Sequence, residues 1–217
     1  MENIKEYIRK LSVAFSKQHL YEAEVNTDPM KQFELWFVEA VESKAPAPNA
    51  MTVSTTNAAG HPSGRILLLR DFNEKGFVFY TNYNSQKARE LNESPYASLT
   101  FFWPSLERQV RIDGPVVKQT AEESDSYFKT RPDGSKLGAW ASPQSEIVSS
   151  RDFLDARYEE MESRFRGSNI PRPEHWGGYC LKPEFYEFWQ GRPNRFHDRI
   201  AYYPQADGHW QIKRLAP

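Results

Sequence analysis

The sequence predicts an α+β protein that is mostly antiparallel β, built as a barrel with flanking helices. Between residues 51 and 117, at least five strand-like segments follow one another with short links, and further strand-like segments run from residue 178 onwards. Short links between consecutive strands favour antiparallel pairing, and closing such a sheet into a barrel removes its edges. A chain of 217 residues is long enough to form one such barrel with a sizeable core.

Composition and charge exclude several classes of protein. The net charge is −1, from 28 basic and 29 acidic residues, so a nucleic-acid binder is not indicated and anion binding must come from local clusters. Cys180 is the only cysteine, which excludes an intramolecular disulfide and fits a reducing compartment. No apolar run approaches membrane-spanning length, and the first residues lack the apolar region of a signal peptide. We therefore expect a cytoplasmic protein that makes no membrane contact.

Two helices are predicted before the first strand. Ile4, Ile8, Leu11 and Phe15 recur at helical spacing, so residues 1–26 are predicted to form an N-terminal helical arm. Thr27-Asp28-Pro29 is a helix start with a capping side chain, and Pro46 and Pro48 end that helix. No later segment has the composition of a linker, so residues 27–217 are predicted to form a single domain.

The strands are bounded by turn residues. The predicted strands of the first β-rich region are Met51–Thr56, Arg65–Arg70, Phe77–Thr81, Ala97–Trp103 and Arg108–Val117. Asn57–Pro62 and Asn73–Gly76 have the composition of turns, and Ser85–Glu93 is predicted to be a short helix.

Two more helices are predicted in the second half of the chain. Thr120–Glu123 has the pattern of a capping box, and Arg131–Gly134 is predicted to stop the helix that it starts. Ser149–Asp152 starts a longer helix that runs to about Phe165.

Several common catalytic motifs are absent from the sequence. It contains no glycine-rich dinucleotide fingerprint, no P-loop and no Gly-x-Ser-x-Gly nucleophile turn. The five histidines do not have the spacing of metal ligands, so no metal site is expected.

A first cluster of polar residues suits a phosphate. Arg65 and Arg70 bound one predicted strand, Tyr80-Thr81 end the next, and Ser85-Gln86-Lys87 open the short helix. Cations combined with the free N–H groups of a helix start bind phosphate well. The alternative is a solvated strand edge protected by cations.

A second cluster also suits a phosphate monoester. Tyr127 and Arg131 lie four residues apart at a helix end, and Ser135 can return to them after the turn. The alternative is an ordinary helix surface, where Tyr and Arg at this spacing are common.

A third cluster lies between residues 185 and 199. Aromatic and polar residues alternate up to Trp189, a turn follows, and then Arg195, His197 and Arg199 are spaced by two. In an extended chain these three side chains leave one face and form a seat for an anion, although a solvated polar strand has the same pattern. Gln109 is spaced in the same way between Glu107 and Arg111 on an earlier predicted strand.

Three stretches near the C-terminus resemble a known family. Glu187-Phe-Trp-Gln-Gly191, Asn194-Arg-Phe-His-Asp-Arg199 and Arg214-Leu-Ala-Pro217 are similar to the C-terminal signature of the pyridoxamine 5'-phosphate oxidases. The resemblance runs from about Thr27 to Pro217. It implies a six-to-eight-stranded FMN-binding split β-barrel that forms a homodimer.

The resemblance also implies roles for individual residues. It assigns FMN binding to Arg65, Arg70, Tyr80, Thr81, Gln86, Lys87, Gln109, Gln144, Ser145, Trp189 and Arg199. It assigns substrate binding to Arg70, Tyr127, Arg131, Ser135, Arg195 and His197, of which the last two are the implied catalytic residues. In the family, the residues that match Gln109, Gln144, Ser145, Trp189 and Arg199 come from the other subunit than the phosphate cluster, so two FMN sites are shared across the homodimer.

Four positions depart from the family pattern. Arg70 stands where the family usually has Lys, and Gln86 stands where it usually has Arg. Because Gln86 removes a cation, FMN retention is expected to be weaker by ~1 kcal/mol than in a site with every cation. Ser12 and Phe15 stand where the family has Arg and Tyr in the N-terminal arm.

The implied activity is the FMN-dependent oxidation of pyridoxamine 5'-phosphate and pyridoxine 5'-phosphate to pyridoxal 5'-phosphate, with O2 as acceptor and H2O2 as product. One alternative is a related split-barrel flavin oxidase that acts on a different aromatic substrate. Another is a non-catalytic protein that binds flavin or pyridoxal phosphate.

Overall fold

A computed structural model of the chain describes residues 4–10, 15 and 18–217. Its strands are β1 (Ala50–Thr56), β2 (Pro62–Leu68), β3 (Asp71–Asn73), β4 (Gly76–Asn82), β5 (Tyr96–Trp103), β6 (Arg108–Lys118), β7 (Trp176–Leu181), β8 (Phe185–Gln190), β9 (Asp198–Pro204) and β10 (Trp210–Arg214). Its helices are α1 (Ile4–Lys10), α2 (Pro29–Glu42), α3 (Gln86–Glu93), α4 (Ala121–Thr130), α5 (Asp133–Ala141) and α6 (Arg151–Arg164), with short 3-10 turns η1 (Pro104–Leu106) and η2 (Pro193–Arg195).

The strands form one curled sheet in which the pairs are antiparallel, as the sequence predicts. The hydrogen-bonded order is β10-β9-β8-β6-β5-β1-β2, and β7 joins β6 to β4, which also pairs with β3. The chain divides into two compact units. The first comprises Met1–Pro48, Phe101–Arg111 and Phe185–Pro217, and the second comprises Asn49–Thr100 and Ile112–Glu184.

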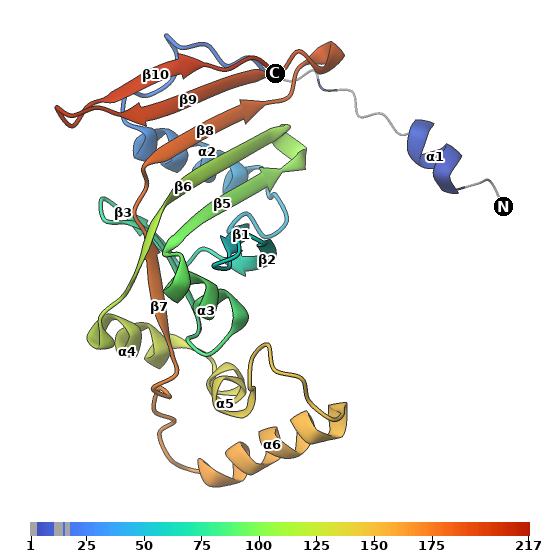
Figure 1. Cartoon of the computed structure of the whole chain (residues 1–217), viewed down its shortest axis with the longest axis vertical. Helices are drawn as coiled ribbons and strands as arrows, with labels where there is room; N and C mark the ends of the chain where they lie inside the picture. The colour runs from blue at the N-terminus through green and yellow to red at the C-terminus, as the bar shows by residue number, and fades with distance from the viewer. Residues whose placement is uncertain (1–3, 11–14, 16–17) are drawn as a thin grey trace. The chain divides into compact units, whose positions relative to one another are not determined.

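In the first unit, α2 packs on the sheet strands (Figure 1). Asp28 caps this helix by accepting a hydrogen bond from the backbone N–H of Met30, which confirms the predicted start. Phe33 lies against Phe101, and Trp36 meets Phe188 edge-on with ring centroids 5.2 Å apart. Leu11 and Ser12 of the predicted arm lie outside the described residues.

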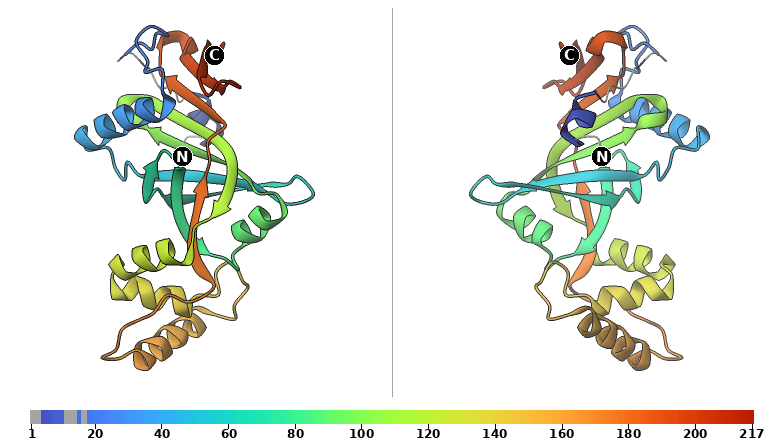
Figure 2. Two further views of the ribbon diagram at one scale, coloured as in Figure 1. Left: turned by 90° about the vertical axis from the view of Figure 1, so that its left-hand side faces the viewer. Right: turned by 90° about the vertical axis from the view of Figure 1, so that its right-hand side faces the viewer.

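In the second unit, α4 lies beside β7, and α5 and α6 follow it in the chain and pack against each other (Figure 2). α5 and α6 share a small core formed by Leu137, Ala141, Met161 and Ile170. α3 begins directly after β4 and carries Lys87 and Glu90 on its buried side. This strand-to-helix junction builds the first part of the candidate site.

The sequence prediction missed α5. Arg131 does end α4, but Pro132 then acts as the residue before a new helix, with φ −57° and ψ 144°. Gly134 lies in the first turn of α5, so the stretch that the sequence predicts to be a helix stop begins a second helix instead. In the described part of the chain, no helix is long and apolar enough to cross a membrane.

Candidate functional site

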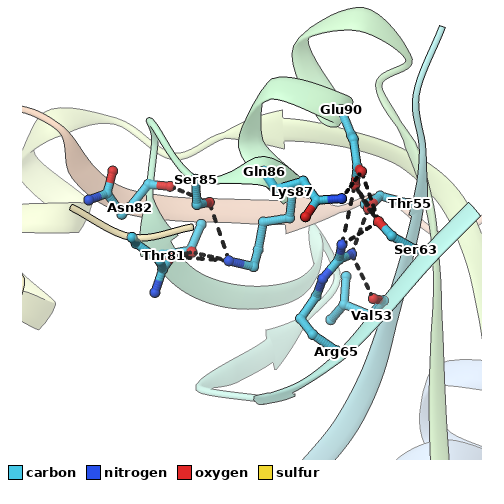
Figure 3. Close-up of polar contacts among 11 residues, drawn as sticks. Val53, Thr55, Ser63, Arg65, Thr81, Asn82, Ser85, Gln86, Lys87 and Glu90 are labelled. Carbon is cyan, nitrogen blue, oxygen red and sulfur yellow. Dashed lines mark hydrogen bonds and ion pairs between the residues drawn. The ribbon is translucent and has the colours of Figure 1, made fainter. Parts of the chain in front are cut away.

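Lys87 is a buried cation at the start of α3 (Figure 3). Its Nζ donates to Thr81 Oγ1, Ser85 Oγ and Gln144 Oε1 at 3.0–3.2 Å, and all three acceptors are neutral oxygens. Burial, followed by the charge of Arg65, lowers the pKa of Lys87 to about 8. A buried ammonium held only by neutral oxygens is stabilised by an anion placed beside it.

Arg65 reaches from β2 to α3 and forms an ion pair with Glu90, at 3.2 Å between Nη2 and Oε2. Glu90 is buried and also accepts hydrogen bonds from Thr55, Ser63 and Gln86. Burial would raise the pKa of Glu90, but these hydrogen bonds and the Arg65 charge hold it at about 2. Glu90 is not among the site residues predicted from the sequence, because a lone carboxylate on a helix is usually solvated.

Two residues expected at the FMN site lie in this cluster in ways the sequence did not indicate. Gln86 is exposed and donates from Nε2 to Glu90 at 2.8 Å; whether it also affects FMN retention stays a prediction. Gln144, which the resemblance assigned to the opposite subunit's share, contacts Lys87 and Thr81 of its own chain. The loop after α5 brings it there, and Ser145 beside it has a left-handed backbone with φ 71°.

A cavity of about 480 Å³ lies in the same unit. Its lining residues are Ile66, Leu67, Leu68, Arg70, Tyr80, Tyr127, Thr130, Arg131, Pro132 and Ser135. The expected substrate residues Arg70, Tyr127, Arg131 and Ser135 therefore share one cavity with Tyr80.

Aromatic rings fix the geometry of this cavity. The Tyr80 and Tyr127 rings are stacked with centroids 4.0 Å apart, and Trp176 stacks on Tyr80 at 5.3 Å. The Arg131 guanidinium lies 4.4 Å from the centroid of Trp176 and donates from Nη2 to the backbone oxygen of Ser135. Because cation–π contact and this hydrogen bond hold the guanidinium plane, Arg131 presents a fixed fork to an anion. Trp176 was not among the expected site residues.

The segment before β9 is not extended, so the prediction of one face for Arg195, His197 and Arg199 is wrong. Pro193 begins the 3-10 turn η2, and Asn194 and Arg195 have left-handed φ values of 59° and 60°. β9 begins only at Asp198. Two consecutive non-glycine residues in this region store backbone strain, which is common at functional sites. Glu107, likewise expected on a strand, caps η1 with φ 57°.

His197 is held by three neighbours in the first unit. Its Nδ1 accepts the backbone N–H of Arg192 at 3.1 Å, so in the neutral ring the proton is on Nε2. Trp189 lies 4.6 Å from the imidazole centroid, and Phe15 meets both rings edge-on at 5.5 Å. Burial and the charge of Arg195 lower the pKa of His197. The ring is therefore a neutral donor through Nε2.

Arg199 pairs with the buried carboxylate of Glu187 in the first unit, and Gln109 lies on β6 of the same unit. Glu187 forms ion pairs with Arg199 at 2.7 Å and with Arg111 at 3.2 Å. The hydrogen bond that Arg199 donates to the Glu187 carboxylate raises the pKa of Arg199. Gln109 is half-buried on β6, and Arg195 is exposed on η2. Among the described residues, no group of His, Cys, Asp and Glu has the arrangement of a metal site.

Comparison with known proteins gives a consistent picture. Residues 37–165 match the model of the pyridoxamine 5'-phosphate oxidase family, and residues 176–217 match the pyridoxine 5'-phosphate oxidase C-terminal dimerisation region. The chain is 51% identical over 212 residues to the pyridoxine/pyridoxamine 5'-phosphate oxidase of Paraburkholderia phytofirmans, covering 97% of this chain and 99% of that one. It is 56% identical over 198 residues to the enzyme of the same name from Cupriavidus necator, covering 91% and 93%.

Solved structures give the same fold. PhzG from Burkholderia lata, in complex with tetrahydrophenazine-1-carboxylic acid, superposes with a TM-score of 0.86 at 27% identity, covering 93% of this chain and 100% of that one. A pyridoxamine 5'-phosphate oxidase-related, FMN-binding protein from Nostoc punctiforme gives 0.69 at 16% identity, covering 89% and 100%. The fold and these matches thus define a split-barrel protein of the oxidase type. The chain belongs to the pyridoxamine 5'-phosphate oxidase family.

Proposed function

We propose that this protein oxidises pyridoxamine 5'-phosphate and pyridoxine 5'-phosphate to pyridoxal 5'-phosphate, using FMN and O2 and releasing H2O2. The observation that carries the proposal is the cavity lined by Arg70, Tyr127, Arg131 and Ser135, because two guanidiniums, a phenol and a hydroxyl suit a phosphate monoester. The similarity to curated oxidases over nearly the whole chain supports it.

The residues around Lys87 fit the phosphate of FMN. A buried ammonium with neutral partners, beside the N-terminus of α3, favours an anion through both charge and backbone N–H groups. We propose that Arg65, Tyr80, Thr81, Gln86, Lys87 and Gln144 hold the cofactor from one chain, with Arg70 beside it. Bound FMN would supply the redox chemistry by accepting a hydride from the substrate.

The protein's own residues would bind and orient the substrate. Tyr127, Arg131 and Ser135 would hold the 5'-phosphate, and the rigid fork of Arg131 would fix its position. His197 would donate a hydrogen bond from Nε2, since its Nδ1 is already used by a backbone N–H. Arg195, exposed on η2, would polarise the departing amine or hydroxyl group.

The sites would be shared across a homodimer. Residues 176–217 match a dimerisation region, and this region contains Trp189, Arg195, His197 and Arg199. We propose that these residues, together with Gln109 and Ser145, complete the site that Lys87 and Arg131 of the partner subunit begin.

A redox experiment tests the function. The protein is loaded with FMN under anaerobic conditions, pyridoxine 5'-phosphate is added, and the visible absorbance of the flavin is followed. Bleaching that reverses on admitting air is the expected result. Bound flavin that stays oxidised with both the alcohol and the amine substrate would contradict the proposal.

A second candidate function is that of a related oxidase whose substrate is an aromatic acid without a phosphate group. It is favoured by the likeness to PhzG, whose structure holds a tetrahydrophenazine carboxylic acid. The same anaerobic experiment with this acid separates the two candidates, since the phosphate-free acid does not need the tyrosine, guanidinium and serine set around the cavity.

A further inference from the structure

Glu187 is a buried carboxylate on the face of β8 that carries Trp189. The residue is 4% exposed. Because side chains alternate along a strand, Phe185, Glu187 and Trp189 lie on one face of the sheet. Arg199 is directly opposite Trp189 in the register of β8 and β9, so its side chain leaves the same face. The carboxylate therefore lies beside two residues that the proposed function assigns to FMN.

Two guanidiniums share this carboxylate, one on each oxygen. Arg199 donates from Nε to Oε1 of Glu187 at 2.7 Å, and Arg111 donates from Nη2 to Oε2 at 3.2 Å. A second acceptor holds Arg199, since its Nη1 donates to the backbone oxygen of Ala216 at 2.8 Å. With Nε and Nη1 both bound to oxygens of the protein, the plane of the Arg199 guanidinium is defined.

Nη2 is the remaining nitrogen of the Arg199 guanidinium. It donates no hydrogen bond to any residue that the structure describes, and the Arg199 side chain is 30% exposed. This nitrogen carries two N–H donors. Arg199 thus has two nitrogens that fix its position and one that is available to a ligand on the face of Trp189.

Packing alone gives no reason for a carboxylate at this position. Burying an ion pair costs desolvation energy, and well-packed apolar residues in its place are often as stable. What the carboxylate does provide is the fixed orientation of a cation. Two guanidiniums and one carboxylate leave the cluster of Arg111, Glu187 and Arg199 with one net positive charge.

We propose that Glu187 is a positioning residue of the flavin site, which orients the Arg199 guanidinium so that Nη2 donates to an acceptor atom of the isoalloxazine ring. This inference rests on the proposed function, which assigns Arg199 to FMN. The ring is the target rather than the phosphate, because the aromatic side chain of Trp189 lies next to Arg199 and suits a flat ring. Glu187 acts only through Arg199, since its two oxygens face guanidiniums.

A double-mutant cycle on the full-length protein freed of flavin tests this role. Dissociation constants of FMN and of riboflavin, which lacks the phosphate, are measured by quenching of flavin fluorescence for Glu187→Gln, Arg199→Gln and the double variant. Glu187→Gln keeps the size of the side chain but offers one oxygen to two guanidiniums. We expect both flavins to bind about tenfold more weakly, the equivalent of one charge-assisted hydrogen bond. Lys87→Gln, by contrast, should weaken FMN and leave riboflavin unchanged.

The double variant separates positioning from a general effect on the fold. Because Glu187 acts through Arg199, the double variant should bind both flavins within about threefold of Arg199→Gln alone. A carboxylate that merely stabilises the fold would weaken binding in the Arg199→Gln background as well. A further loss of about tenfold in the double variant therefore overturns the inference.

Glu187→Asp keeps the test decisive if Glu187→Gln does not fold. It retains the charge but is one methylene shorter, so it cannot reach both guanidiniums. We expect a loss of about threefold for both flavins, and no loss in the Arg199→Gln background. Glu184→Gln, an exposed carboxylate just before β8, is the matched control and should change neither affinity.

The outcomes distinguish this inference from the proposed function. A wild-type protein that binds no FMN overturns both. Normal binding by the wild type overturns only the role of Glu187 if its variants leave the affinity for flavin unchanged, or if their losses multiply with that of Arg199→Gln.

Discussion

Lys87 is a buried cation whose hydrogen-bond partners are all neutral. Thr81, Ser85 and Gln144 satisfy its three hydrogens but supply no negative charge, and burial lowers its pKa to about 8. Since the folded-state pKa lies below the ordinary value of 10.5, the ionised form is disfavoured in the free protein and is restored by an anion.

The sign of this shift gives a pH prediction. Below about pH 8 Lys87 is protonated in the free protein, so in the proposed site it would attract the FMN phosphate. As the pH rises through that value Lys87 loses its proton, and the attraction would fall. We expect the dissociation constant of FMN to increase above pH 8, by at most about tenfold per pH unit. Titrations from pH 7 to 9.5 measure this, with riboflavin as the control ligand. Lys87→Met should bind FMN weakly and without this pH dependence; a strong dependence in that variant would locate the titrating group elsewhere.

Arg131 gives a prediction for the substrate. Arg131→Lys keeps the charge but loses the planar fork and its stacking on Trp176. We expect the KM for pyridoxine 5'-phosphate to rise roughly 10- to 100-fold, the equivalent of one charge-assisted hydrogen bond, with the flavin still bound. Steady-state kinetics measure it, and Lys129→Ala on the exposed side of α4 is the control. An unchanged KM would mean that the phosphate binds elsewhere.

At the scale of elements, the sequence predicts the helix caps correctly, but it does not predict the helix that starts after Pro132 or the contacts between residues far apart in the chain. Asp28, Thr120 and Ser150 each cap a helix where the sequence predicts it, because a cap needs only the next three residues. The contact between Lys87 and Gln144 joins residues 57 positions apart, and no local pattern encodes it.

The prediction for the segment before β9 was wrong for a different reason. A spacing of two describes one face only if the chain is extended, and Pro193 with the left-handed Asn194 makes a 3-10 turn instead. The residues of this part of the candidate site were named from the resemblance, but their geometry required the structure.

The connection between β8 and η2 contains Gly191, where a larger side chain does not fit. A Cβ at Gly191 would lie 2.7–2.9 Å from atoms of the Phe15 side chain, which packs against Trp189 and His197. Gly191→Ala should therefore displace Phe15 and expose His197, so that its pKa rises toward the ordinary value of 6.5.

NMR titration of the His197 ring protons measures this change. Phe15→Ala should reproduce the shift, because it removes the same ring. Gly138→Ala on α5, where a Cβ meets nothing within 4 Å, is the matched control. If Gly191→Ala leaves the His197 titration unchanged, Phe15 does not contribute to the burial of the imidazole.

At the scale of the whole molecule, the candidate residues fall into two groups in different compact units. Lys87, Arg131 and the cavity belong to the second unit, whereas Trp189, His197 and Arg199 belong to the first. The resemblance names residues of both groups, but it assigns Gln144 to the group of Trp189 and Arg199, whereas in the fold Gln144 contacts Lys87 of its own chain.

This division makes the shared-site proposal testable by complementation. Lys87→Gln and Arg199→Gln each change one group, so every site in either homodimer contains a defect. If each site takes one group from each chain of a dimer, a heterodimer of the two variants has one doubly altered site and one intact site. We expect a tagged, purified heterodimer to recover about half of the wild-type FMN binding and turnover. If each site is formed within one chain, both sites of the heterodimer keep a defect and nothing is recovered. A dimer of two Lys87→Gln chains that carry the two different tags controls for the effect of the tags.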